Sequence, residues 1–205
     1  MLTTDPYIWV LDNALDPDFC AHLINKFEED TESQHEGLVG DWTVKPEVKS
    51  SQDLFLSDKP NWVAEDRHLY QNLQDNIVNY QNHIGTQLNL NPDMQWHPLA
   101  CTLEPLEKGD VGYQIQRTQP GKGYIWHTDY MLNFDHNRLY TFIWYLNTIT
   151  EEGYTEFYNG IKVQPQAGRL LIFPATWTYV HRGVPPKSGV KYICTGWVHG
   201  KIPKQ

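Results

Sequence analysis

The sequence predicts an α+β fold that is mainly β, a jelly-roll core supported by N-terminal helices. After Pro98, short segments rich in β-branched and aromatic residues alternate with glycine, proline and asparagine turns at a spacing of roughly ten residues. Before that point, apolar residues recur at steps of three or four, as on one face of an amphipathic helix. The composition is that of a globular chain, with 40% hydrophobic and 20% charged residues.

The length of the chain predicts a single domain. Its 205 residues suit one hydrophobic core, and no internal repeat, low-complexity tract or convincing linker divides them. We therefore expect residues 1–205 to form one domain, with a helix-containing part over residues 1–100 and the jelly-roll core over residues 101–205.

The N-terminal part is expected to start with a strand at residues 7–13, which are rich in β-branched and aromatic side chains. Asp16 is a suitable N-cap and Pro17 a suitable first helical residue, so a helix should follow. Residues 31–53 are polar and predict a long loop. Residues 62–88 show the best helical periodicity of the chain, carried by Leu69, Leu73, Ile77, Tyr80 and Ile84.

The C-terminal part contains five segments that are typical of β-strands. They are residues 111–118, 138–147, 154–165, 168–174 and 190–198. The third of them contains Asn159-Gly160, the strongest short signal for a β-hairpin. Many short strands at this spacing favour a sandwich or barrel, and here a jelly roll.

Charge, hydropathy and cysteine usage exclude several classes of protein. A net charge of -9 disfavours a nucleic-acid binder, and no apolar run approaches the roughly 20 residues that span a bilayer. The acidic N-terminus lacks the basic segment of a secretory signal. Three distant cysteines form neither a disulfide framework nor a CxxC knuckle, so we expect a cytoplasmic protein.

One short stretch, GYIWHTDY at residues 123–130, contains a histidine and an aspartate separated by one residue. On a strand, His127 and Asp129 would leave the same face, because side chains alternate with a period of two. Two adjacent titratable groups on one face are unusual in a packed core and ordinary in a metal site.

His181 is the best candidate for a further ligand, because it follows soon after the predicted strand at residues 168–174. The other histidines are expected to be solvated, half-buried or without a partner nearby in the sequence: His22, His35, His68, His83, His97, His136 and His199.

Two histidines and one carboxylate make up the facial triad of non-haem Fe(II) oxygenases. These ligands leave one side of the metal free for a co-substrate and dioxygen, whereas a closed site of four protein ligands would not. An anionic co-substrate such as 2-oxoglutarate also needs a cation. Lys191, ten residues after His181, is the candidate. Its strand neighbours are apolar, and burying a lysine among them without an anionic partner costs free energy. The alternative is a solvated lysine at a strand end.

Several motifs together resemble the prolyl 4-hydroxylase-like group of Fe(II)/2-oxoglutarate-dependent dioxygenases. They are HTD at 127–129, EEGYTEF at 151–157, GRLLIFP at 168–174, VHRGVPPKSGVKY at 180–192, and Trp197. Residues 12–28 and 138–147 also resemble the family, so the resemblance covers most of the chain and is weakest over residues 31–100. HxD alone is a weak signal, but its combination with the later histidine, lysine and tryptophan is specific.

The resemblance implies a double-stranded β-helix, which is a jelly roll, with N-terminal helices supporting one sheet. His127, Asp129 and His181 would bind iron, and Lys191 would pair with the distal carboxylate of 2-oxoglutarate. Fe(II), 2-oxoglutarate and dioxygen are the implied cofactors, with ascorbate for sustained turnover. The implied reaction hydroxylates an unactivated C–H bond while 2-oxoglutarate is converted to succinate and carbon dioxide.

One position departs from the family pattern. A tyrosine that often stands nine residues before the first histidine is replaced here by Thr118, which could donate a shorter hydrogen bond to the co-substrate. Other candidates for this contact are Tyr113, Gln116 and Tyr145. Two aromatic residues also have more than one reading: Tyr124 would line the substrate side or pack in a strand, and Trp197 would wall the co-substrate pocket or fill the barrel.

The substrate is expected to be a prolyl or other side chain of a peptide or protein, with a free amino acid or another small molecule as the alternative. Specificity should depend on loops 31–60 and 130–138. A metal-binding jelly roll without catalysis and a degenerate scaffold module are the other classes, but no metal ligand of the family is missing. Aromatic strands are compatible with a dimer, and no membrane or nucleic-acid partner is expected.

Overall fold

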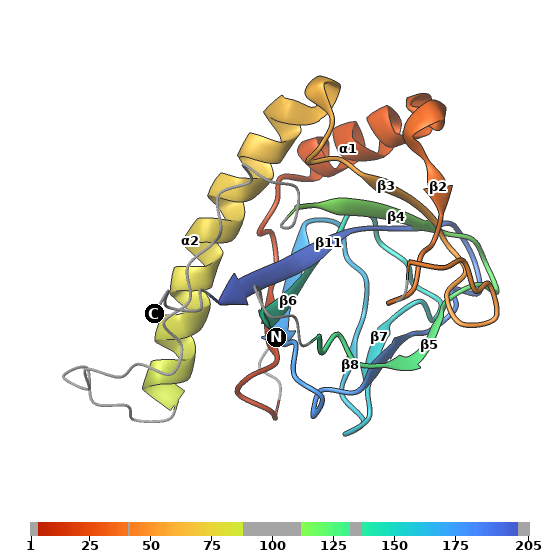
Figure 1. The fold of residues 1–205 in the computed structure, drawn as a ribbon. Helices are drawn as coiled ribbons and strands as arrows, with labels where there is room; N and C mark the ends of the chain where they lie inside the picture. Colours follow the sequence, from red (N-terminus) through yellow and green to blue (C-terminus); the bar gives the residue numbers. More distant parts are fainter. Residues whose placement is uncertain (1–3, 41, 88–111, 132–136, 201–205) are drawn as a thin grey trace.

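Two antiparallel sheets and two long helices make up the computed structural model, which describes residues 4–40, 42–87, 112–131 and 137–200. The larger sheet has the strand order β1-β9-β6-β11-β4-β3-β2, and the smaller one β5-β10-β7-β8. In Figure 1 the two helices lie on one side of the larger sheet, and the smaller sheet lies on the other. This is the double-stranded β-helix with supporting helices that the sequence predicts.

The N-terminal elements follow the predicted order. Strand β1 (Trp9–Leu11) precedes α1 (Pro17–Glu29), whose N-cap is Asp16. The Asp16 carboxylate accepts a hydrogen bond of 2.7 Å from the Asp18 backbone N–H, a contact worth about 1 kcal/mol. The predicted cap and first helical residue are therefore confirmed.

The predicted loop at residues 31–53 is only partly irregular. It contains a 3-10 turn at Thr31–Ser33 and strand β2 (His35–Glu36), and its end enters β3 (Gln52–Phe55). Strand β3 pairs with β4 (Gln114–Thr118), so this polar stretch joins the larger sheet. Neither β2 nor β3 shows a clean apolar alternation, which is why the sequence pattern indicated a loop.

The second helix, α2 (Val63–Gln87), follows a 3-10 turn at Pro60–Trp62 and matches the predicted range closely. Its apolar stripe packs with α1 against one face of the larger sheet. The buried side chains of this helix-side core include Phe27, Trp62, Tyr80, Ile115 and Trp144. Residues 88–111, including His97 and Cys101, lie outside the described part of the chain, as does His136.

The remaining strands form the two walls of the jelly roll. Strands β6 (Asn137–Tyr145), β9 (Arg169–Pro174) and β11 (Lys191–Gly200) are central to the larger sheet. Strands β5 (Tyr124–His127), β7 (Thr155–Phe157), β8 (Lys162–Val163) and β10 (His181–Gly183) form the smaller one. Strands β7 and β8 pair antiparallel, and Gly160 between them adopts a φ of 87°, so the predicted hairpin is confirmed.

A second apolar cluster fills the space between the two sheets. Ile143 and Tyr145 of β6 and Leu171 and Phe173 of β9 contribute to it from the larger sheet, and Phe157 of β7 from the smaller one. This packing fixes the separation of the walls, so that side chains at their open end can meet at short range. No helix among the described residues is long and apolar enough to cross a membrane.

Candidate metal centre

Two neighbouring strands of the smaller sheet bring His127 and His181 together. The two residues stand opposite each other in the antiparallel pair of β5 and β10, and their ring centroids are 4.3 Å apart. The strands approach closely because Gly123 has no side chain: a Cβ there would collide with the carbonyl oxygen of Gly183. Local backbone chemistry thus allows the two imidazoles to meet.

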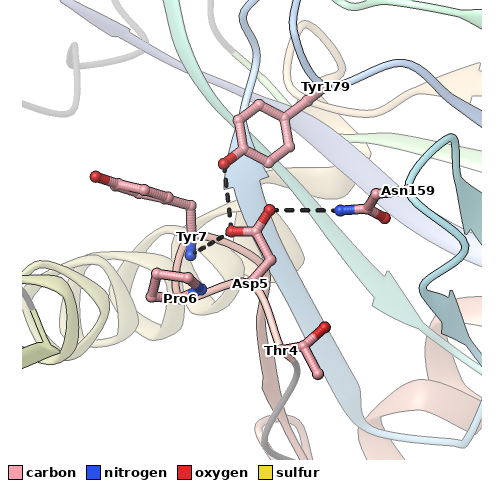
Figure 2. Close-up of a pocket in the computed structure, with 6 residues that line it drawn as sticks. All are labelled: Thr4, Asp5, Pro6, Tyr7, Asn159 and Tyr179. Atoms are coloured by element: carbon pink, nitrogen blue, oxygen red, sulfur yellow. Dashed lines mark hydrogen bonds between the residues drawn. The ribbon is translucent and has the colours of Figure 1, made fainter.

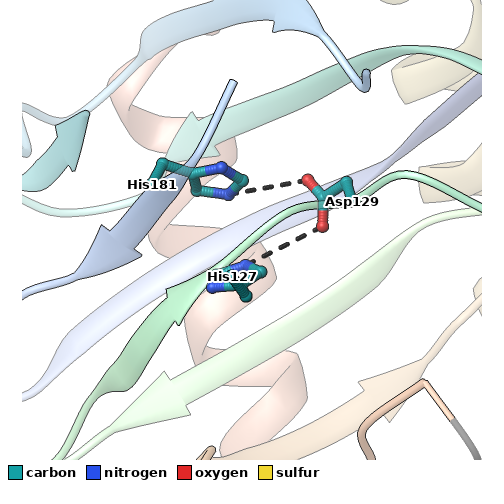
Figure 3. A group of neighbouring side chains, drawn as sticks. All are labelled: His127, Asp129 and His181. Atoms are coloured by element: carbon teal, nitrogen blue, oxygen red, sulfur yellow. Dashed lines mark ion pairs between the residues drawn. The ribbon is translucent and has the colours of Figure 1, made fainter. Parts of the chain in front are cut away.

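Asp129 completes the group, although it does not lie on the strand. Strand β5 ends at His127, so the prediction that both residues lie on one strand face is wrong for Asp129. Its carboxylate nevertheless turns toward both rings, with Oδ1 3.8 Å from His127 Nε2 and Oδ2 3.6 Å from His181 Nε2 (Figure 3). One ligand atom from each residue lies within 4.8 Å of the others.

Backbone carbonyls orient both imidazoles. His127 Nδ1 is 2.8 Å from the carbonyl oxygen of Ile125, and His181 Nδ1 is 3.0 Å from that of Tyr179. Because a carbonyl oxygen only accepts, each Nδ1 must carry the proton and donate. The lone pair of each ring is then on Nε2, which points toward Asp129, as metal ligation requires.

The protonation states also favour ligation. The pKa of His127 is lowered to about 4, chiefly by burial and then by the neighbouring His181, while Asp129 partly opposes the shift. Burial alone would raise the pKa of Asp129, but the two histidines and a hydrogen bond from Thr141 hold it below its usual value. At neutral pH the site therefore offers a neutral imidazole at His127 and an ionised carboxylate, the forms that bind metals.

The donor set fits a divalent transition metal. Metal–ligand distances of about 2.1 Å place neighbouring ligand atoms roughly 3 Å apart, so the three side chains, whose ligand atoms lie within 4.8 Å of one another, would draw together when a metal binds. Two imidazole nitrogens and one carboxylate oxygen are the facial triad that leaves one side of Fe(II) open. Among the described residues, no other group of three such side chains converges in this way.

A buried cation lies near this centre. Lys191 is 5% exposed, and its amine donates one hydrogen bond of 3.0 Å to the carbonyl oxygen of Gly153. A Cβ on Gly183, two residues after His181, would be 3.7 Å from this amine. No carboxylate of the described residues forms an ion pair with Lys191, and burial lowers its pKa to about 8. A solvated strand-end lysine is therefore ruled out.

The predicted co-substrate contacts are distributed over both faces of the larger sheet. Thr118 stands opposite Lys191 in the pair of β4 and β11 and is buried. Tyr145 lies between the sheets, where its hydroxyl donates to Thr155 Oγ1 at 2.7 Å. Tyr113 instead packs against Phe142 and Trp144 in the helix-side core. Because it lies on the opposite face from Thr118, we no longer consider it for this contact.

Of the two predicted aromatic residues, Tyr124 contacts the metal centre directly, and Trp197 is connected to it through Arg138. The Tyr124 ring stacks on the His127 imidazole with centroids 3.5 Å apart, and burial raises the pKa of its hydroxyl to about 12. The Trp197 ring is covered by the guanidinium of Arg138 at 3.4 Å. The buried indole N–H of Trp197 has no hydrogen-bond partner in the described part of the chain.

Sequence reasoning missed three groups around the site. Thr141 donates a hydrogen bond to Asp129 Oδ2, Arg138 lies beside the same residue, and Lys49 forms a buried ion pair with Asp53. Thr141 and Arg138 are both on β6, and an inward-facing threonine in an apolar strand was the available signal. Lys49 and Asp53 lie in the polar stretch that the sequence predicts to be a long loop.

The other described histidines contact residues outside the metal centre, and one prediction about them is wrong. His199 was expected to be solvated, but it is buried on β11. His22 is 2.7 Å from Glu65 Oε1, His68 stacks on Phe19, and His83 contacts the ring of Trp9.

A surface pocket near the N-terminus is lined by residues other than those of the metal centre. Its lining residues are Thr4, Asp5, Pro6, Tyr7, Asn159 and Tyr179 (Figure 2). The Asp5 carboxylate accepts hydrogen bonds from the Tyr7 backbone, the Tyr179 hydroxyl and the Asn159 amide. None of the three metal-centre side chains lines it. Its link to the metal centre is Tyr179, whose carbonyl accepts from His181.

Comparisons with known proteins agree with this geometry. Residues 113–199 match the 2OG-Fe(II) oxygenase superfamily. A PKHD-type hydroxylase of Synechococcus sp. (strain CC9902) is 28% identical over 93 residues, which are 43% of this chain and 41% of that protein. The chain thus spans less than half the length of this curated relative.

Solved structures show the same fold at low sequence identity. A viral collagen prolyl hydroxylase from Paramecium bursaria Chlorella virus-1 has a TM-score of 0.62 at 21% identity, covering 95% of this chain and 96% of its own. A Pseudomonas putida prolyl-4-hydroxylase has a TM-score of 0.62 at 21% identity, covering 94% and 92%. A Trichoplax adhaerens prolyl hydroxylase in complex with a hypoxia inducible factor peptide fragment has a TM-score of 0.68 at 16% identity, covering 95% and 84%.

Proposed function

We propose that the chain is an Fe(II)- and 2-oxoglutarate-dependent dioxygenase, because its residues 113–199 match the 2OG-Fe(II) oxygenase superfamily. Its substrate would be an unactivated C–H bond in a prolyl or other side chain of a peptide or protein. The observation that carries this proposal is the convergence of His127, Asp129 and His181. Close to them lies the buried Lys191, which has no carboxylate partner among the described residues.

In this proposal His127, Asp129 and His181 hold Fe(II), and Lys191 pairs with the distal carboxylate of 2-oxoglutarate. The Thr118 hydroxyl, opposite Lys191, would donate to the same carboxylate. Bound Fe(II) and 2-oxoglutarate together supply the oxidising power: dioxygen delivers one oxygen atom to the C–H bond and the other to 2-oxoglutarate, which leaves as succinate and carbon dioxide.

The chain's own residues contribute orientation, charge and exclusion of water. The carbonyls of Ile125 and Tyr179 hold the two imidazoles in the tautomer that presents Nε2 to the metal. Asp129 supplies the negative charge that offsets part of the metal's charge. Burial of Lys191 makes an incoming carboxylate its favourable partner, because water cannot solvate the amine as it does in bulk.

A peptide substrate is supported by the solved prolyl hydroxylases, one of which is in complex with a peptide fragment. It is also supported by the surface of the molecule, where Tyr130, directly after Asp129, is 43% exposed. Aromatic side chains at such a position are common anchors in peptide recognition.

A free carboxylic acid, such as an amino acid, is the second candidate substrate, and Arg138 is the observation that favours it. Its guanidinium is largely buried over Trp197, and it forms no ion pair with a carboxylate of the described residues. Its guanidinium donates a hydrogen bond of 3.3 Å to the backbone carbonyl oxygen of Asp129. Guanidinium forks bind carboxylates with two parallel hydrogen bonds, so a substrate carboxylate would complete this site.

We also propose that residues 1–205 form one domain and act in a reducing compartment such as the cytoplasm. Strand β3 of the N-terminal part pairs with β4, and β1 pairs with β9, which supports one folding unit. Cys20 and Cys194 are buried free thiols, which suits a reducing setting. With a net charge of -9, no nucleic-acid partner is expected.

The test is turnover of purified protein with Fe(II), 2-oxoglutarate, ascorbate and air, in the presence of either proline-containing peptides or free amino acids. We expect succinate formation coupled to the gain of one oxygen atom by a substrate, seen by mass spectrometry, and its loss in Asp129→Ala. Arg138→Leu separates the two candidates, since it should abolish turnover of a free acid and spare much of that of a peptide. Equal succinate formation by wild type and Asp129→Ala would contradict the proposal.

A further inference from the structure

Asp129 is held at two points by the same strand. The Thr141 hydroxyl on β6 donates to Asp129 Oδ2 at 2.7 Å, and the Arg138 guanidinium, three residues earlier, donates to the Asp129 carbonyl at 3.3 Å. Thr141 is 2% exposed and stands opposite Phe173 of β9 and Trp197 of β11. This hydrogen bond is therefore buried in the wall of the barrel and shielded from water.

The two carboxylate oxygens of Asp129 are otherwise similar. Each lies within 4 Å of one histidine nitrogen, Oδ1 at 3.8 Å and Oδ2 at 3.6 Å. A carboxylate can bind a metal through one oxygen or through both. Among the described residues, a hydrogen bond reaches Oδ2 and none reaches Oδ1, so Thr141 is the group that distinguishes them.

We propose that Thr141 is a positioning residue: its hydroxyl holds Asp129 Oδ2 in a hydrogen bond, so that Asp129 binds the metal through Oδ1 alone. This inference rests on the proposed function. A second carboxylate oxygen on the metal would occupy a coordination position that the reaction needs for its small-molecule reactants. Thr141 keeps that position open without touching the metal, the co-substrate or the substrate.

The chemistry of threonine suits this role. A β-branched side chain has a restricted χ1, so the hydroxyl of Thr141 stays directed at Oδ2. A hydrogen bond to an ionised acceptor in a buried site is stronger than one between neutral groups. Strand β6 is paired on both sides, with β9 and β11, so the donor itself is attached to a rigid element.

The test uses Thr141→Val, which keeps the shape of the side chain and removes the hydroxyl, with Thr141→Ser as the matched control that restores it. Each protein is loaded anaerobically with Fe(II) and 2-oxoglutarate, and nitric oxide is titrated as a probe of the remaining coordination position, read by electron paramagnetic resonance. We expect Thr141→Val to keep far more Fe(II) affinity than Asp129→Ala, while its nitric oxide affinity falls by about 10- to 100-fold, the size of effect that loss of an outer-shell partner typically has. Thr141→Ser should behave as wild type.

Three results would overturn the inference. One is unchanged nitric oxide affinity in Thr141→Val. Another is a loss of Fe(II) binding as large as that of Asp129→Ala, which would mean that Thr141 merely supports the fold. The third is failure of Thr141→Ser to restore the wild-type signal.

Failure of the proposed function looks different, because wild type itself would then bind neither 2-oxoglutarate nor nitric oxide through iron. Melting temperatures establish that each variant is folded. If Thr141→Val does not fold, Thr141→Ala removes the same hydroxyl and carries the same expectations.

Discussion

Two lysines of this protein are almost equally buried and have opposite surroundings. Lys49 is 6% exposed, and its amine lies 2.5 Å from Asp53 Oδ2. The same carboxylate accepts hydrogen bonds from Ser51 and Gln114. Lys191 is 5% exposed, and among the described residues its amine has the carbonyl oxygen of Gly153 as its partner and no acid.

This difference indicates that the charge of Lys49 stabilises the fold, whereas the charge of Lys191 is available to bind a ligand. At Lys49 the compensating charge is part of the fold, so the region is complete without a ligand. At Lys191 burial lowers the pKa of the amine to about 8 because nothing negative offsets the loss of water. A fold that leaves a cation in this state near a candidate metal centre gains when an anion arrives.

Asp53→Ala should give the largest effect on stability, because it leaves Lys49 buried without its partner. Breaking a buried pair in this way costs about 3–5 kcal/mol of the free energy of unfolding, measured by urea denaturation. Asp58→Ala is the matched control, since Asp58 is 55% exposed in its pair with Lys59 and should contribute at most about 1 kcal/mol. Equal losses for the two variants would remove the contrast between the lysines.

Lys191→Met should affect ligand binding and leave stability intact, the opposite of Asp53→Ala. It deletes a buried charge that has no acid partner, so the folded protein should be as stable as wild type or more stable. Its affinity for 2-oxoglutarate should fall about 100-fold, as expected when one partner of a buried charge pair is truncated, measured by calorimetric titration under anaerobic Fe(II). Undiminished affinity, or a destabilisation like that of Asp53→Ala, would mean that Lys191 is structural too.

The pH dependence of 2-oxoglutarate binding sharpens the same contrast. Binding needs the protonated amine of Lys191, so affinity should be constant below pH 8 and fall by up to about tenfold per pH unit above it. Stability of the ligand-free protein should change in the other direction. The pKa of Lys191 is below its ordinary value of 10.5 in the folded state, so the unfolded chain binds more protons between pH 8 and 10.5, and stability rises with pH there.

Lys191→Met provides the control for both pH trends, because it has no amine to titrate at this position. The variant should lose the decline in affinity above pH 8 and the associated gain in stability. If both trends persist in Lys191→Met, another group is responsible for them.

Ser51→Ala should give the smallest effect. It removes one of the hydrogen bonds that hold Asp53 against Lys49 and should cost about 1 kcal/mol of stability in thermal or chemical unfolding. Affinity for 2-oxoglutarate should not change, because Ser51 supports the ion pair of Lys49 and Asp53, which needs no ligand to balance its charges. A change in that affinity would mean that the Lys49 region takes part in co-substrate binding.

The grouping of His127, Asp129 and His181 and the burial of Lys191 could be expected from the sequence, because most of their signals are local. His127 and Asp129 are two residues apart, and Lys191 is ten residues after His181 on a strand with apolar neighbours. The helices and most strands also carry periodic patterns that do not depend on distant partners. The cap of α1 at Asp16 is of the same kind.

The remaining features depend on which strands become neighbours. The Thr141 hydroxyl reaches Asp129 because β6 lies against the segment that follows β5, and no pattern within either segment indicates that the two become neighbours. Lys49 and Asp53 fall in a stretch whose polar pattern predicts a loop, because their burial depends on pairing with strands distant in the sequence. His199 is buried for the same reason, since β11 continues through Trp197 to Gly200 rather than ending in solvent.

The most direct measurement of the central claim is the visible charge-transfer band that forms when Fe(II) and 2-oxoglutarate bind together, recorded anaerobically for wild type, Asp129→Ala and Lys191→Met. Wild type should show the band, Asp129→Ala should lack it at any 2-oxoglutarate concentration, and Lys191→Met should reach it only at much higher 2-oxoglutarate. No band in wild type would contradict the assignment of this site to Fe(II) and 2-oxoglutarate, and a band that survives in Asp129→Ala would contradict the assignment of its ligands.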